Sequence, residues 1–81
     1  MTNKDATCAY YLSDLGKLLK ERAQKAKSAR DSADAASQEF ENGHLHAYYA
    51  VVSHMQNQAL AFGLTFEDVG LDGIDPDKDL I

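Results

Sequence analysis

The feature that most constrains this chain is a long stretch of helix-forming residues. Between Lys17 and Asn42 the sequence contains neither glycine nor proline and is rich in Ala, Leu, Lys, Glu, Gln and Arg, which have high helix propensity. Apolar residues recur there at spacings of three and four, the period of an α-helix. We therefore predict a helix from about residue 5 to about residue 41, and Gly16 is the point where it is most prone to kink or break.

The apolar residues of this helix form a narrow seam. With Leu12 as heptad position a, every a and d position is apolar except Arg22, which predicts one packing edge along the helix. Cys8 occupies a d position, so we expect it to be a small buried side chain. The seam consists of Cys8, Leu12, Leu15, Leu19, Ala26, Ala29, Ala33, Ala36 and Phe40.

A second, shorter helix is predicted from about residue 44 to about residue 62. Asn42-Gly43 is a strong stop signal for the first helix, because both residues tolerate the left-handed conformation. A second seam then begins at once and is closed by Gly63: Leu45, Tyr48, Val52, Met55, Ala59 and Phe62. So short a connection turns the second helix back antiparallel to the first, so that Phe62 is expected near Ala23.

Residues 64–81 differ in kind and form what we call the C-terminal arm. Thr65 is positioned to accept a hydrogen bond from the amide of Asp68, which predicts a single capped turn. Two glycines, a proline and alternating acids follow, typical of irregular structure. The predicted organisation is thus a helical hairpin over 1–63 and an arm over 64–81 that packs on the hairpin or on a partner chain.

The first half of the long helix is left without a neighbour in this hairpin. It carries large apolar side chains that a monomer would expose, and we predict that they form a protein-interaction surface. Either the arm or a second chain can cover them, and an 81-residue chain has too thin a core for a lone hairpin. We therefore predict an all-α fold that dimerises into a four-helix arrangement. The surface comprises Tyr10, Tyr11, Leu12, Leu15, Leu18 and Leu19.

Charge is distributed unevenly. The net charge is −5, yet a basic band within the long helix carries +5 when Glu21 is included: Lys17, Lys20, Arg22, Lys25, Lys27 and Arg30. The acidic part of the arm contains Asp72, Asp75, Asp77 and Asp79, and docking of this arm on the basic band is one expectation. The band wraps around the helix and has no interleaved aromatics, so nucleic acid is the weaker class of partner.

Motifs for catalysis or metal binding are not evident in the sequence. His44 and His46 point about 200° apart on a helix, and the alternating acids Asp75, Asp77 and Asp79 lack the glycine and final acid of a calcium loop. A lone cysteine and the lack of a long apolar run indicate a cytoplasmic protein outside the membrane.

The sequence therefore predicts a non-enzymatic protein without a cofactor that acts by protein–protein interaction. We expect self-assembly together with binding of a partner protein, for which an acidic inhibitor or immunity-type role is one form. A nucleic-acid-associated regulator that uses the basic band is the alternative.

Overall fold

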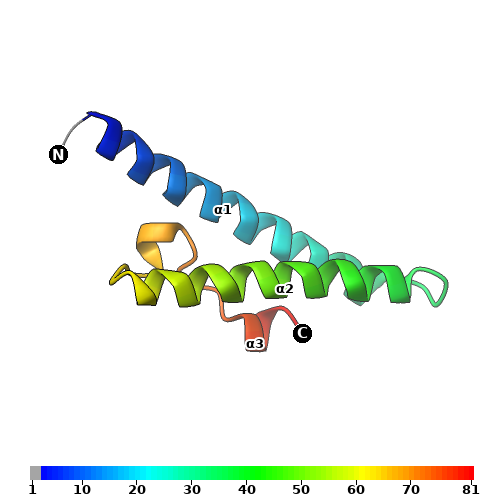
Figure 1. Cartoon of the computed structure of the whole chain (residues 1–81). Coiled ribbons are helices and arrows are strands. Elements are labelled where there is room, and N and C mark those ends of the chain that lie inside the picture. The colour runs from blue at the N-terminus through cyan, green and yellow to red at the C-terminus, as the bar shows by residue number, and fades with distance from the viewer. Residues whose placement is uncertain (1–2) are drawn as a thin grey trace.

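The computed structural model describes residues 3–81 and consists of helices joined by short turns, without a strand in that range. The first two residues of the predicted 1–63 hairpin lie outside the described part. Helix α1 (Asn3–Ser32) and helix α2 (Gln38–Ala61) are the two long elements, followed by a 3-10 turn, η1 (Glu67–Val69), and a single helical turn, α3 (Pro76–Asp79). The two long helices pack against each other as an antiparallel hairpin (Figure 1). The predicted all-α hairpin is confirmed.

The reversal of the chain lies earlier than predicted. Helix α1 ends at Ser32 and the chain turns over residues 33–37, whereas Asn42-Gly43 lies inside α2. The backbone amide of Ser37 donates to Oδ1 of Asp34 at 2.9 Å and also to the main-chain oxygen of Asp34 at 3.1 Å. Short polar side chains compete with the helix in this way. The predicted stop at residues 42–43 is therefore wrong, because Gly43 keeps a helical backbone.

The earlier turn also changes which parts of the helices are paired. Ala59 of α2 lines a groove together with Leu12 of α1, so α2 extends past Ala23, where the sequence placed its end. The helices nevertheless splay apart in this direction, and η1 occupies one side of the opening (Figure 1). The first half of α1 is thus only partly covered.

The packing edge of α1 only partly follows the predicted seam, because Gly16 and Ala23 are buried in place of Leu15 and Arg22, whereas Ala26 is buried as predicted. Gly16, Ala23 and Ala26 are its buried residues, whereas Cys8 is exposed, contrary to the prediction. Positions 16, 19, 23 and 26 follow the 3.6-residue period of a straight helix, and this choice keeps the charge of Arg22 out of the core. Other predicted seam positions are exposed: Ala29, Ala36 and Phe40.

Helix α2 follows its predicted seam more closely. Leu45, Val52 and Ala59 are buried, and Phe62 at its end is exposed. The predicted end of the helix is confirmed: Gly63 has φ +74°, and the amide of Leu64 bonds to the oxygen of Ala59 at 2.8 Å. This is the Schellman arrangement, for which glycine is favoured.

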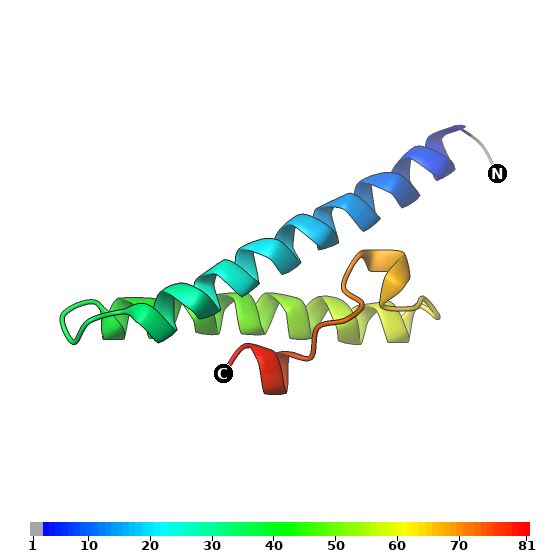
Figure 2. The ribbon, with the colours of Figure 1, turned by 180° about the vertical axis from the view of Figure 1, so that it is seen from behind.

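The C-terminal arm packs along one face of the hairpin. Its segment from η1 to α3 crosses in front of α2 in Figure 2 and passes behind it in Figure 1. The arm supplies much of the buried apolar core, namely Val69, Leu71, Ile74 and Leu80. Gln56 is buried in α2 and donates hydrogen bonds from its amide to the main-chain oxygens of Leu71 and Ile74, at 3.1 and 2.9 Å.

Two glycines allow the arm and α1 to come into backbone contact. A Cβ on Gly16 would lie 1.6 Å from the main-chain oxygen of Val69, and a Cβ on Gly70 would lie 2.1 Å from that of Ser13. Gly70 also has φ +73°, a conformation that residues with a side chain rarely adopt. Helix α1 continues unbroken through Gly16, the point where a break was most expected, and this glycine provides space for η1.

Both turns of the arm are held by capping residues. The predicted cap is confirmed: the amide of Asp68 donates to Oγ1 of Thr65 at 3.1 Å, and the amide of Thr65 donates to Oδ2 of Asp68 at 2.9 Å. Helix α3 was not predicted from the sequence. Asp75 caps this helix, since its Oδ1 accepts a hydrogen bond from the amide of Asp77 at 3.0 Å. The signal for the helix was Asp75-Pro76, a capping residue followed by proline at the first helical position.

Candidate protein-interaction surface

The arm identifies the side of the hairpin that is left uncovered. The arm bonds to Lys20 and Lys27 of α1 and to Tyr49 of α2. At 100° per residue, a residue nine positions earlier lies about 180° away on the same helix. Tyr11, Leu18 and Phe40 stand in that relation to the three arm-bound residues, and all three are exposed.

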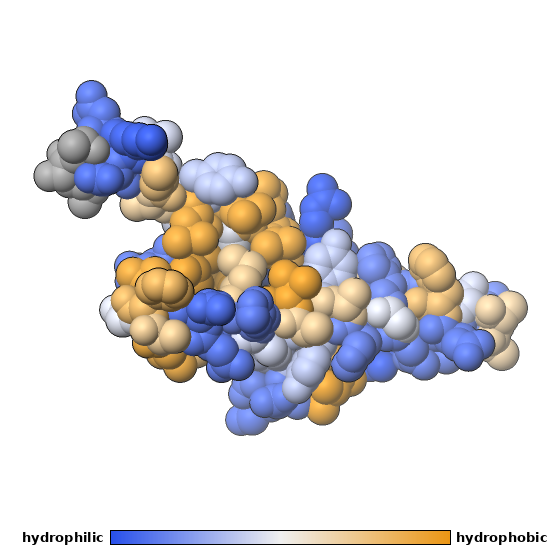
Figure 3. Space-filling view, viewed as in Figure 1, coloured by the Kyte–Doolittle hydropathy of each residue, from blue (hydrophilic) through white to orange (hydrophobic). Residues whose placement is uncertain are grey.

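These residues belong to what we call the open face, the side of the hairpin opposite the arm. Figure 3 shows it, with apolar residues gathered where α1 and the end of α2 diverge. The face combines fully exposed with partly buried side chains, so it is continuous with the core beneath. Its apolar and aromatic residues are Tyr11, Leu12, Leu15, Leu18 and Leu19 from α1 and Phe40, His44, Tyr48, Val51, Met55 and Phe62 from α2. The exposed Arg22 and Lys25, four and seven positions after Leu18, lie on the same side of α1.

The residues predicted to form an interaction surface are divided between two sides of α1 in the structure. Tyr11 and Leu18 are exposed on the open face, whereas Leu12, Leu15 and Leu19 are partly buried. Tyr10 lies about 100° from Tyr11 and lines a different groove, beside η1. No residue of α2 was predicted to belong to this surface, because the spacing of apolar residues in the sequence placed Phe40 on the first helix and Phe62 in the core.

An apolar groove lies in the opening between the helices on this face. It has a volume of about 190 Å³ and is lined by Leu12, His54, Met55, Gln58, Ala59, Phe62, Leu64 and Val69. A cavity of about 150 Å³ is large enough to hold a benzene molecule. The groove can therefore accept an aromatic side chain.

At the other end of the open face, aromatic rings follow one another along α2. The His44 ring lies 6.0 Å from Phe40 and 5.3 Å from Tyr48, centroid to centroid. Beside them a groove of about 350 Å³ has Arg22, Lys25 and the small Ala26 and Ala29 on its α1 side. Small residues opposite large ones leave room for side chains from another molecule to pack.

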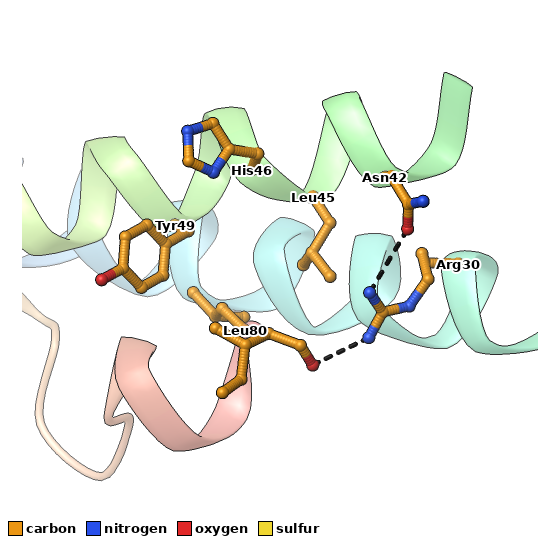
Figure 4. Close-up of a pocket in the computed structure, with 7 residues that line it drawn as sticks. Arg30, Asn42, Leu45, His46, Tyr49 and Leu80 are labelled. Atoms are coloured by element: carbon orange, nitrogen blue, oxygen red, sulfur yellow. Dashed lines mark hydrogen bonds between the residues drawn. The ribbon is translucent and has the colours of Figure 1, made fainter. Parts of the chain in front are cut away.

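The basic band does not form one surface. Lys20 donates to the main-chain oxygen of Asp72 at 2.7 Å, and Lys27 and Arg30 each donate to that of Ile81 at 2.7 Å. Figure 4 shows Arg30 between this oxygen and the side chain of Asn42, beside Leu45 and Leu80. Lys17, Arg22 and Lys25 make no hydrogen bond or ion pair within residues 3–81.

The acidic side chains of the arm are not the groups that bind this band. Asp75 and Asp79 bond to amides within the arm, at Asp77 and Asp75 respectively, and Asp72 is exposed. Asp77 accepts a 2.5 Å hydrogen bond from the Tyr49 hydroxyl. This bond raises the pKa of Tyr49 above its ordinary value of 10.0, because it stabilises the neutral phenol.

Two residues of the basic band, Lys27 and Arg30, form ion pairs with Asp31. Its Oδ1 lies 2.9 Å from Nε of Arg30 and 3.2 Å from Nζ of Lys27. Hydrogen bonds from Arg30 and then Lys27 lower the pKa of Asp31 below its ordinary value of 3.8. These contacts orient the basic side chains toward the end of the arm.

Within residues 3–81, no group of three or more His, Cys, Asp or Glu residues is arranged to hold a metal ion. No helix in the same range has the length and apolar character needed to cross a bilayer. Comparison of the chain with protein-family models, curated proteins and solved structures finds no match. Geometry and charge therefore carry the functional proposal.

Proposed function

We propose that this chain acts without catalysis, through protein–protein interaction, and that it self-associates as a homodimer through the open face. The observation that carries the proposal is the one-sided position of the arm. It buries its own apolar residues against one side of the hairpin, and the opposite side keeps exposed aromatic and aliphatic residues from both long helices. Contiguous apolar surface of this kind is typical of interaction sites.

The shape of the molecule supports the same proposal. The radius of gyration is 14.5 Å and the dimensions are 52 × 21 × 17 Å, whereas a compact domain of this length has a radius of gyration of about 12 Å. An elongated monomer has a thin core and exposes more of its side chains to water. Pairing two such hairpins thickens the core at the cost of ordering few additional residues.

The test is the mass of the protein in solution as a function of concentration, by sedimentation equilibrium. We expect a dimer, and we expect Val51→Asp to weaken dimerisation at least about tenfold, because it places a carboxylate in an apolar interface. Val51 is 42 % exposed in the single chain, so the substitution spares the core.

Leu60→Asp is the matched control. Leu60 lies nine positions after Val51, so it is on the opposite side of α2, and it is 61 % exposed. We expect this variant to dimerise as the unaltered protein does. A monomer at all concentrations, or equal effects of the two substitutions, would contradict the proposal.

A further inference from the structure

The open face has two unlike ends, and this difference constrains how a second copy can bind. At the end near Leu12 the helices splay and leave the apolar groove, whereas at the end near the 33–37 turn they lie close together and carry the exposed ring of Phe40. Phe40 is 71 % exposed in the single chain. A groove at one end and an exposed aromatic residue at the other are complementary features on one surface.

We propose that two copies pair with their open faces together and their long axes antiparallel, so that Phe40 of each chain enters the groove beside Leu12 of the other. The inference rests on the proposed homodimer and specifies its geometry. A twofold axis makes both contacts equivalent, as an isologous interface requires. The same rotation lays Leu15 over the partner's Ala26, which places a large side chain against a small one.

The exposed area is sufficient for such an interface. The chain exposes 5630 Å², whereas a compact protein of 8.9 kDa exposes about 4,800 Å². The excess, about 800 Å², equals what each partner buries in an interface of standard size. The surplus therefore matches in size the area that one second copy would cover.

The antiparallel arrangement fits the shape of the hairpin better than a parallel one. A parallel pair would bring the two splayed ends together, so that Phe40 of neither chain could reach the groove of the other. Antiparallel pairing sets each splayed end against a narrow end. The wedge shapes then complement each other, and the apolar residues of the open face are removed from water.

Cys8, the only cysteine, is exposed and serves as a distance probe. Phe40 lies level with Ala29 of α1, since both line one groove, so the axis passes α1 about midway between Leu12 and Ala29, near residue 21. Cys8 is 13 residues from that point, or about 20 Å at 1.5 Å per residue. Nitroxide labels on the two Cys8 residues should therefore lie about 40 Å apart.

Pulsed electron paramagnetic resonance on the labelled full chain measures this distance. A distribution centred near 40 Å supports the antiparallel dimer, and one below about 20 Å, the value for a parallel pair of adjacent helices, overturns it. A dimeric mass with any other distance also overturns it and leaves the proposed function intact. A monomeric mass without a defined distance contradicts the proposed function itself.

A second measurement tests the Phe40 contact. We expect Phe40→Ala to raise the dissociation constant of the dimer at least about tenfold, while Leu60→Ala, a deletion on the opposite side of α2, leaves it within about twofold. Circular dichroism should show equal helicity in both variants, because both side chains are exposed in the single chain. Equal dissociation constants for Phe40→Ala and the unaltered protein would overturn the placement of Phe40.

Discussion

Replacing Gly16 by alanine tests the backbone contact that joins the arm to α1. The new Cβ would lie 1.6 Å from the main-chain oxygen of Val69, 2.7 Å from its carbonyl carbon and 3.0 Å from Cα of Gly70. All three atoms belong to the backbone, so no side-chain rotation relieves the clash. The turn η1 must move away from α1 by more than an ångström.

The expected effect follows from two opposing contributions. Alanine is favoured over glycine in a helix by about 1 kcal/mol. Displacement of η1 loosens the burial of Val69 and Leu71, which are 4 % and 0 % exposed, and full burial of each such side chain contributes about 1.5–3 kcal/mol. We therefore expect Gly16→Ala to reduce the free energy of unfolding by about 2–4 kcal/mol. For a domain of this size, that lowers Tm by at least about 10 °C.

The assay is urea unfolding followed by circular dichroism at 222 nm, at one protein concentration, because self-association adds to stability. Gly43→Ala is the matched control: nothing lies within 4 Å of its new Cβ, so helix propensity alone should stabilise the protein by about 0.5–1 kcal/mol. If Gly16→Ala is as stable as Gly43→Ala, the close approach of η1 to α1 is refuted.

Three further outcomes are expected. Gln56→Ala leaves two buried main-chain oxygens unpaired and should lower the free energy of unfolding by about 1–3 kcal/mol in the same assay; an unchanged midpoint would refute the role of this amide in holding the arm. The lowered pKa of Asp31 means that its contribution to stability is present above pH 3.8 and is lost as pH falls through the folded-state pKa. Asp31→Asn should flatten that part of the unfolding profile between pH 5 and about pH 2.5, and a profile identical to that of the unaltered protein would count against the ion pairs with Arg30 and Lys27. The raised pKa of Tyr49 means that its contribution is present below pH 10.0 and is lost as pH rises through the folded-state value, so spectrophotometric titration should show one late-ionising phenol that disappears in Tyr49→Phe.

The residues of the open face were only partly predictable from sequence, because spacing on one helix does not tell which side a third segment will cover. Tyr11 and Leu18 were predicted as surface residues and are exposed. Phe40 was assigned to the seam of the first helix, because the turn at residues 33–37 carries neither glycine nor proline and its signal is a single Asp34–Ser37 pair. Once the turn is placed there, Phe40 belongs to α2 and lies on the open face.

The basic band illustrates the same limit for charge. Its net charge predicted that carboxylates would bind it, and the sequence placed four aspartates in the acidic part of the arm, residues 72–79. In the structure, Lys20, Lys27 and Arg30 bind main-chain oxygens of the arm instead, because the aspartates at 75 and 79 already cap α3. A local hydrogen bond within a turn forms with less loss of chain entropy than a long-range ion pair at the surface.

The sequence by itself determined the helical class, the antiparallel hairpin, the Gly63 end of α2 and the Thr65 cap, since each depends on residues close together in the chain. The tertiary structure alone decided which residues of α1 face the core, and what Gly16 and Gly70 are for. Both depend on how closely the arm approaches α1, where Gly16 and Gly70, 54 positions apart in the chain, are in backbone contact. The arm can cover only one side of a two-helix hairpin. The apolar residues on the other side are the reason why we propose an interaction surface for this chain.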